Sequence, residues 1–476
     1  MKVNIGIRTL TICLLGLLIF TPNISFSHNI DLPDLGEAAS QHMSVSQEKR
    51  LGEVIYPMVL GDLSIIYDPL INNYIQFLGS KLVKSLKNNK LQYKFIVINN
   101  NRINAFAAPG GIIVLNSGLI NATKSESELV GVLAHEIAHI NLRHHSRMFY
   151  ENKEFSLTDT ITAVATLIAA MHDHASIGST YFVGQAAKAQ RKLNIIREKE
   201  VEADLKAFSI MRNTGYNPGA MVKFLNRIKE QNIDQIYEYL STHPITENRI
   251  KFYQNIKNRP VKPSFIYNII KKRTASLTNY SNFENIKTEE KIYQMLNKYN
   301  ESFHIGEFDK SLNLLEELER KLKNNGSLFE EVRVYIELLK AEIFYEKKDY
   351  SKALVITSNL YQLYPNNIYI RIILAEIYYK KKNYNQVFNI LAVQNIYEKN
   401  IVASTLLSAS AHKKNEISLG HEYKAEAEKL KGRYFNAIKF YELAKKYNLK
   451  GNIVDKRIDA KIRQIHNLQS ARDILK

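Results

Sequence analysis

The sequence predicts an α+β chain that is mostly α, with an N-terminal domain built around a small β-sheet and a C-terminal α-helical repeat domain. Two runs rich in β-forming residues, Tyr93 to Ile98 and Ile112 to Leu115, flank a glycine turn in the N-terminal part. Beyond Pro260 and Pro263 the chain becomes helical, tyrosine-rich and almost free of proline, and it acquires a 34-residue period. These observations divide the chain into two parts near residue 260.

The first residues are typical of a secreted protein. Lys2 and Arg8 precede an apolar run from Leu10 to Phe20, and Ser25 to Ser27 offer small residues where a signal peptidase cuts. We therefore interpret residues 1–27 as a cleaved signal peptide; an uncleaved N-terminal anchor is the alternative. The single cysteine of the chain lies inside the apolar run, so the mature protein is expected to fold on an ordinary core without disulfides.

The basic charge of the chain does not indicate nucleic-acid binding. Lys and Arg outnumber Asp and Glu by 65 to 47, a formal net charge of +18. The basic residues are spread along the sequence, no clustered stripe or nucleic-acid motif accompanies them, and there is no tryptophan. We expect no nucleic-acid partner, and we keep peripheral contact with an acidic membrane surface as a secondary expectation.

The residues 135–139 read His-Glu-Ile-Ala-His, and a Ser-x-x-Glu capping box that begins at Ser125 predicts the start of their helix. Residues i and i+4 lie on one face of a helix, so His135 and His139 can bind one metal ion. Glu136 lies beside them and can act as general base towards a metal-bound water. The segment therefore predicts a zinc peptidase site.

Two candidates exist for the third metal ligand, and the first follows the helix directly. His145 stands six residues after His139, where metzincin peptidases place a third histidine. That pattern requires glycine at position 142 so that the helix ends abruptly, whereas Leu142 and Arg143 can continue a helix. We therefore interpret His144 and His145 as polar residues near the helix end and not as ligands.

The second and preferred candidate lies in an acidic helical segment. Glu200 and Asp204 are i and i+4, so Glu200 can bind zinc while Asp204 holds a ligand histidine through its other ring N–H. Taken alone, Glu198, Glu200 and Glu202 could equally form a solvated charged face paired with neighbouring lysines. Together with the His-Glu-x-x-His segment, they favour the metal site.

Two further segments carry candidate site residues. One of the two β-rich runs could be an edge strand that binds an extended substrate through its backbone; an ordinary structural hairpin of these runs is the alternative. Asn104, Ala105 and Phe106 lie between the runs and are possible substrate-binding residues. His243 precedes Pro244, which restricts the backbone before it to extended conformations and so fixes where the imidazole is carried.

These segments together resemble the BepA (YfgC) type of periplasmic HExxH zinc metallopeptidases with C-terminal tetratricopeptide repeats. The blocks that carry the resemblance, in order, are Asn104 to Gly111, His135 to His139, Glu200 to Asp204, Ser241 to Pro244, and Arg249.

The resemblance implies a zincin-like metallopeptidase fold with one Zn²⁺ per chain, bound by His135, His139 and Glu200. It implies Glu136 and His243 as catalytic residues and Arg249 as structural support for the active site. His243 would either stabilise the oxyanion of the transition state or occupy the place of the water in a latent enzyme.

The C-terminal repeat is marked by recurring small and aromatic residues. Ala341 and Tyr350 recur as Ala375 and Tyr384, which gives the tetratricopeptide period of 34 residues. Less regular flanking repeats are expected at two aromatic positions, Phe308 and Tyr434. Stacked helix pairs present a concave surface, so we expect this part to position substrates or to dock on a partner.

The predicted organisation comprises a signal peptide (1–27), a zinc metallopeptidase domain (28–259), a linker (260–284) and a tetratricopeptide-repeat domain (285–476). The resemblance implies a periplasmic endopeptidase that degrades misfolded or misassembled envelope proteins during outer-membrane protein assembly. The repeats would contact the assembly machinery. The alternative is a chaperone or adaptor for that assembly with a latent protease site.

Overall fold

The computed structural model describes residues 44–87, 89, 91–145, 147, 186–230, 243–246, 249–250, 264–278, 291–323, 326–398, 400–449 and 451–474. Statements below refer to these residues. The predicted signal peptide lies outside them. Among the described helices, none combines the length and the apolar composition that a membrane crossing requires.

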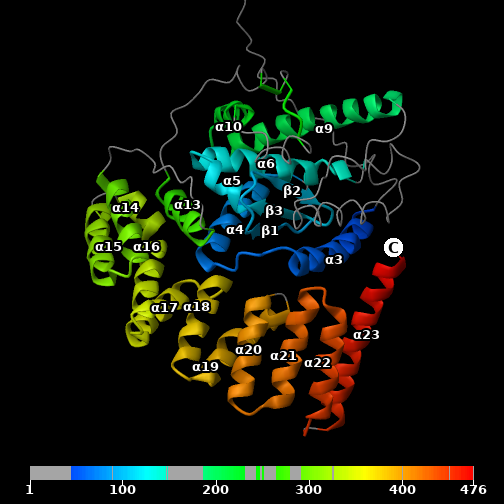
Figure 1. Cartoon of the computed structure of the whole chain (residues 1–476), viewed down its shortest axis with the longest axis vertical. Helices are drawn as coiled ribbons and strands as arrows, with labels where there is room; N and C mark the ends of the chain where they lie inside the picture. Colours follow the sequence, from blue (N-terminus) through cyan, green and yellow to red (C-terminus); the bar gives the residue numbers. More distant parts are fainter. Residues whose placement is uncertain are drawn as a thin grey trace, which may run out of the picture.

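The N-terminal part contains a small sheet surrounded by helices (Figure 1). Its elements, in chain order, are α3 (Val45–Asp62), α4 (Pro69–Lys84), β1 (Lys94–Ile98), β2 (Ala105–Ala108), β3 (Ile112–Asn116), α5 (Ser117–Ala122), α6 (Glu126–Asn141), α9 (Ala186–Asn213), α10 (Gly219–Lys229) and α13 (Phe265–Leu277).

The sheet has the order β1-β3-β2, which leaves β2 at an edge. β1 and β3 pair in parallel, so the two β-rich runs are paired strands, and the hairpin alternative for them is wrong. The hairpin joins β2 to β3 in antiparallel fashion. Its turn contains Gly110 and Gly111, both at φ +83°, a conformation that side chains disfavour. A Cβ on Gly110 would lie 2.3 Å from the Cα of Gly52, so this close approach lets α3 cross the turn.

α6 is the central helix of the N-terminal part and packs against α4, β2, α9 and α10. Its start is capped as predicted at Ser125, whose hydroxyl accepts the Glu128 N–H at 3.3 Å. The Glu128 carboxylate instead reaches back to the Lys124 N–H at 2.7 Å and pairs with Arg227 on α10. From residue 127 to residue 140 the helix is buried on all sides, so its polar residues face other protein groups and not solvent.

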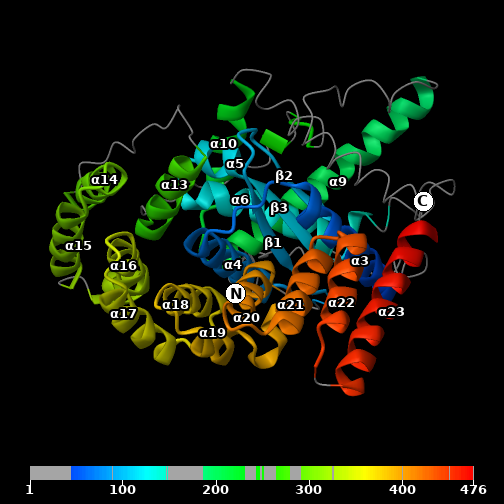
Figure 2. The same ribbon diagram turned by 60° about the horizontal axis from the view of Figure 1, so that its bottom comes forward.

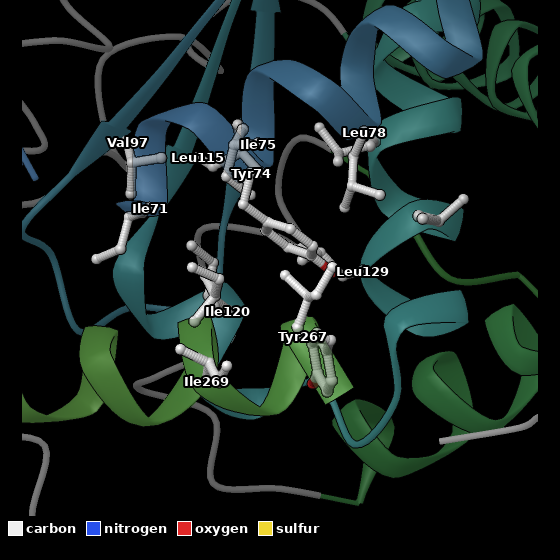
Figure 3. Packing of buried hydrophobic residues seen from close by; sticks show 14 of the residues in the cluster. Ile71, Tyr74, Ile75, Leu78, Val97, Leu115, Ile120, Leu129, Tyr267 and Ile269 are labelled. Atoms are coloured by element: carbon white, nitrogen blue, oxygen red, sulfur yellow. The ribbon is translucent and has the colours of Figure 1, made fainter. Parts of the chain in front are cut away.

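Part of the segment predicted as a linker is a helix, α13. Residues 265–277, within the predicted linker at 260–284, form a helix that packs against α4 and α5. Figure 3 shows Tyr267 and Ile269 of this helix in the same cluster as Tyr74 on α4 and Leu129 on α6. The Tyr267 hydroxyl donates to the carbonyl oxygen of Thr123 at 2.6 Å. This segment is therefore part of the N-terminal core and not an extended connection.

The C-terminal part is entirely helical in the described residues and follows an arc beside the N-terminal part (Figures 1 and 2). The confirmed fold class is thus α+β, mostly α. The elements are α14 (Lys291–His304), α15 (Phe308–Lys323), α16 (Gly326–Glu346), α17 (Tyr350–Leu363), α18 (Ile368–Lys380), α19 (Tyr384–Leu391), a 3₁₀ helix η1 (Val393–Glu398), α20 (Ile401–Lys413), α21 (Ile417–Leu430), α22 (Tyr434–Lys446) and α23 (Asn452–Ile474).

The 34-residue period corresponds to a repeated helical turn. Tyr350 and Tyr384 begin α17 and α19, and each lies 5.5 Å, ring centroid to centroid, from a tyrosine at the end of the preceding helix. The turn before each is a Schellman turn with one left-handed residue. Within the described residues of the C-terminal part, the same hydrogen-bond pattern occurs at five left-handed residues: Gly306, Lys348, Lys382, Asn415 and Gly432.

The helical part contacts the N-terminal part through α13, α4 and α3. Arg273 of α13 binds Asp68, which caps α4, at 2.7 Å, and binds both oxygens of Glu342 on α16 at 2.7 Å. One hydrophobic cluster continues from the sheet through α13 to α18. The two parts of the described chain are therefore packed together through both apolar and charged contacts.

Candidate metal centre

The two histidines of α6 meet the acidic residues of α9 in the buried interior. The Nε2 atoms of His135 and His139 lie 3.0 Å apart. Glu200 of α9 places its Oε2 3.2 Å from the first and its Oε1 3.2 Å from the second. All three side chains are at most 11 % exposed, so the charge of Glu200 is held away from solvent.

Asp204 fixes the orientation of His135. Its Oδ1 lies 2.9 Å from His135 Nδ1, on the opposite side of the ring from Glu200. In the neutral ring, a hydrogen on Nδ1 would point at this carboxylate and would leave Nε2, which faces Glu200, as the atom that can bind a metal. Arg249 in turn donates Nε–H and Nη2–H to the two oxygens of Asp204 at 2.6 and 3.0 Å. The sequence-predicted residues Asp204 and Arg249 are thus both brought to this site.

Burial and charge shift the pKa values of the cluster in opposite directions. Burial lowers the pKa of His135, but Glu200 and Asp204 outweigh it and raise this pKa to about 10. Burial lowers the pKa of His139 well below its usual value. Burial raises the pKa of Glu200, but His243 and His135 outweigh it and hold this pKa well below the ordinary range. The cluster therefore keeps an ionised carboxylate beside imidazole groups.

Glu136 is directed towards the edge strand β2. Its carboxylate is hydrogen-bonded to the backbone of Ala107. It is 1 % exposed, and burial raises its pKa, with smaller opposing effects from His243 and His135. A carboxylate of raised pKa that is fixed beside a strand edge can accept and return a proton there.

His243 joins the cluster from a separate segment of the chain. Its Nδ1 lies 3.1 Å from Glu200 Oε1 and 3.3 Å from His135 Nε2, and its Nε2 lies 3.4 Å from Glu136. Arg249 Nη1 donates to the carbonyl oxygen of Pro244 at 3.1 Å, which anchors this segment. His243 is therefore in contact with the predicted ligands and with the predicted base at once.

The four groups fit a metal ion. One ligand atom from each of His135, His139, Glu200 and His243 lies within 4.8 Å of the others. The Nε2 atoms of His135 and His139 are too close for both to carry hydrogen, so at least one of them presents a lone pair to the cluster. Two imidazoles and a carboxylate are ligands that zinc accepts. Among the described residues, His144 and His145 do not belong to this group.

The predicted substrate-binding residues lie at the start of the edge strand. Ala105 and Phe106 belong to β2, and Asn104 immediately precedes it. Phe106 faces Val114 in the ladder with β3. β2 packs against α6, so the strand edge and the His-Glu-x-x-His helix are neighbours.

His144 lies just beyond the end of the helix and is not in the ligand group, but the expectation that the helix continues through Leu142 and Arg143 is wrong. α6 ends at Asn141, and Arg143 adopts a left-handed conformation at φ +55°. The chain therefore turns, and His144 points back so that its Nδ1 lies 2.9 Å from Nδ1 of His139. The expectation of a continuing helix misplaced this residue, and no local signal such as glycine marks the turn.

Comparison with known proteins agrees with this geometry. Residues 69–257 match the model of peptidase family M48. The chain is 30% identical over 306 residues to the beta-barrel assembly-enhancing protease of Yersinia pestis, covering 60% of this chain and 62% of that protein. It is 32% identical over 263 residues to the protein of the same name from Escherichia coli strain K12, covering 54% of each chain.

More distant relatives carry metallopeptidase names as well. The chain is 28% identical over 161 residues to the mitochondrial metalloendopeptidase OMA1 of Arabidopsis thaliana, which covers 34% of this chain and 31% of that protein. The chain thus spans less than two thirds of each of these relatives. The matched region, residues 69–257, contains the histidines and carboxylates described above, and this part of the chain is therefore similar to peptidase family M48.

Proposed function

We propose that the protein is a zinc-dependent endopeptidase in which His135, His139 and Glu200 bind the metal and Glu136 is the general base. The observation that carries this proposal is the convergence of three ligand atoms from two helices beside a buried carboxylate. When bound, zinc would lower the pKa of a water and polarise the peptide carbonyl. The remaining steps belong to the side chains and the backbone of the chain.

Glu136 would take the proton of the attacking water as the new C–O bond forms, and would give it to the amine nitrogen as the C–N bond breaks. Its raised pKa suits both transfers, because the carboxyl gains and loses the proton more nearly at neutral pH. Asp204 would hold His135 with its Nε2 lone pair directed at the metal, and Arg249 would hold Asp204.

We propose that His243 keeps the resting enzyme latent. Its Nδ1 lies as close to Glu200 as the Nε2 atoms of the other two histidines do, which supports a fourth metal ligand in the place of the water. Displacement of this segment would free the position for water and carbonyl oxygen. Stabilisation of the transition-state oxyanion is the other role, and it requires His243 to remain near the substrate without occupying that place.

The edge position of β2 supports an extended peptide as substrate. An unfolded chain could pair with this strand through backbone hydrogen bonds without a requirement for particular side chains. The proposed substrates are misfolded or misassembled envelope proteins in the periplasm. This assignment rests on the sequence similarity to proteins named for β-barrel assembly and on the predicted signal peptide at residues 1–27.

The helical C-terminal part would dock the enzyme on the outer-membrane assembly machinery as a tetratricopeptide-repeat domain. The repeated turns and the arc of stacked helices support this role. A chaperone or adaptor with a latent protease site is the second candidate, and the contact of His243 with the ligand cluster favours it. A mutant of the repeat surface that loses assembly function while Glu136→Gln retains it would support this second function.

The test is cleavage of an unfolded model protein by the zinc-loaded full chain. Wild type, Glu136→Gln and His243→Ala are compared at equal measured zinc content. The proposal expects cleavage by His243→Ala and none by Glu136→Gln, and cleavage confined to His243→Ala would support latency. Equal inactivity of all three proteins with stoichiometric zinc would contradict the peptidase proposal.

A further inference from the structure

The ring of His139 has a second contact that the proposed mechanism does not use. Its Nε2 faces Glu200, while its Nδ1 lies 2.9 Å from Nδ1 of His144. The other nitrogen of His144, Nε2, lies 3.2 Å from Oε2 of Glu202. Arg147 holds both oxygens of Glu202, at 2.6 and 3.3 Å. Four side chains thus form one hydrogen-bonded row that begins at a predicted metal ligand.

The backbone brings His144 into this row by leaving the helix. On a continuing helix His144 would be five residues beyond His139 and would point about 140° away from it. The left-handed residue Arg143 turns the chain instead. The Arg143 side chain is buried and its Nε lies 3.1 Å from Oε2 of Glu48 on α3, an ion pair that holds the turn in place. Such a conformation costs a non-glycine residue about 1 kcal/mol, so the turn is maintained by its surroundings.

The positions of the hydrogens follow from the chemistry of the row. This step rests on the proposed function, in which the Nε2 of His139 must be bare to bind metal. Its hydrogen is then on Nδ1 and is donated to Nδ1 of His144. His144 must therefore carry its own hydrogen on Nε2, which it donates to Glu202. Arg147 keeps Glu202 as a carboxylate acceptor, and every atom in the row has a compatible partner.

We propose that His144, Glu202 and Arg147 are positioning residues that hold His139 in its metal-binding tautomer and orientation. His135 is held in a similar way but without an intervening histidine. Asp204 contacts its ring directly, and Arg249 holds Asp204. The helix α9 thus supplies one ligand and an anchor for each histidine. Glu200 and Asp204 face the interior, while the side chain of Glu202 is 26 % exposed at the rim and reaches His139 through His144.

The experiment measures the zinc affinity of the full chain by competition with a chromophoric chelator. Glu202→Gln and His144→Leu are expected to raise the Kd for zinc by about 10- to 100-fold, the usual effect of removing a partner of a metal-binding histidine. His144→Gln is expected to restore most of the affinity, because its amide can accept from His139 and donate to Glu202. Glu198→Gln is the matched control, since it makes the same change at an exposed position of the same helix.

A second readout reports the tautomer directly. In ¹⁵N-histidine spectra of the zinc-loaded chain, His144 is expected to carry hydrogen on Nε2 and none on Nδ1. Hydrogen on Nδ1 of His144, or a Kd for His144→Leu and Glu202→Gln within about threefold of wild type, would overturn the proposal. Far-UV circular dichroism confirms that each variant is folded.

The outcomes also separate this proposal from the peptidase function. Weaker zinc binding in these variants, with no cleavage by any zinc-loaded protein, would support the positioning role of the row and would contradict the proposed peptidase function. Failure of the folded wild type to bind zinc would contradict both.

Discussion

The buried guanidinium of Arg249 offers a quantitative test of how the site is held together. Its side chain is fully buried and donates to Asp204 at 2.6 and 3.0 Å, and its Nη1 lies 2.9 Å from Oε2 of Glu200. Replacement of Arg249 by Met keeps much of the apolar volume but leaves two buried carboxylates without this cation. Breaking a buried ion pair from one side costs about 3 to 5 kcal/mol. The metal-free chain is expected to lose free energy of unfolding in this range.

Zinc changes the size of the predicted loss. A bound cation would compensate Glu200, so Arg249→Met should destabilise the zinc-loaded chain less than the metal-free chain. With a urea dependence of about 3 kcal/mol per molar, a loss of 3 kcal/mol moves the unfolding midpoint by about 1 M. The assay is urea unfolding followed by far-UV circular dichroism, with and without zinc, and the first transition is compared.

The matched control is Arg212→Met, an exposed arginine on the same helix as Glu200 and Asp204. Surface substitutions of this kind change stability by about 0.5 kcal/mol or less. A midpoint for metal-free Arg249→Met within about 0.2 M of wild type would refute the reasoning. An equal loss with and without zinc would refute the part that assigns compensation to the metal.

Three further predictions follow from other parts of the structure. His135 has a pKa of about 10 without metal, so below that pH zinc must displace a proton from its ring. The affinity for zinc, measured by chelator competition, should therefore rise about tenfold per pH unit from pH 6 to 9, and less steeply in Asp204→Asn. An affinity that does not change with pH would contradict this prediction. Gly52→Ala should lower the free energy of unfolding by about 1 to 3 kcal/mol, because the added Cβ would lie 2.6 Å from the backbone of Gly110. The control is Gly131→Ala, whose added Cβ would lie 3.1 Å from the flexible side chain of Met221, and equal thermal unfolding midpoints for the two variants would contradict the packing argument. Arg273→Met should increase hydrogen exchange in the first turn of α4 and in α16, and unchanged exchange there would show that the charged contact does not hold the two parts together.

The sequence predicts those features of the fold that depend on the spacing of residues along a short stretch of chain. The 34-residue interval from Tyr350 to Tyr384 is the interval between two helices that begin at equivalent turns. The turn at Asn415 has the same geometry but is followed by Ile417 and not by an aromatic residue, so the pattern of aromatics passes over it. The repeat was therefore predictable where the sequence repeats, and not where only the backbone does.

Long-range pairing and backbone turns limit what can be predicted. The parallel pairing of β1 with β3 depends on the path of the chain through β2, which no local pattern reveals. α13 lies between prolines and polar segments, and its burial against Tyr74 and Thr123 becomes visible only in three dimensions.

The candidate site shows the same division. The spacing of His135, His139, Glu200 and Asp204 on two helices indicates which side chains share a face, and the structure brings these faces together. His144 could not be placed in this way because the left-handed turn at Arg143 depends on a buried partner 95 residues earlier in the chain.

The most direct measurement of the central proposal compares zinc-loaded His243→Ala with the double variant His243→Ala/Glu136→Gln. Both are assayed for cleavage of the same unfolded protein, and zinc content is determined in the same samples. We predict that the first cleaves and that the second, with equal zinc, is slower by at least about 100-fold, because only the general base has been removed. Equal rates for the two proteins would contradict the assignment of Glu136 and with it the proposed peptidase mechanism.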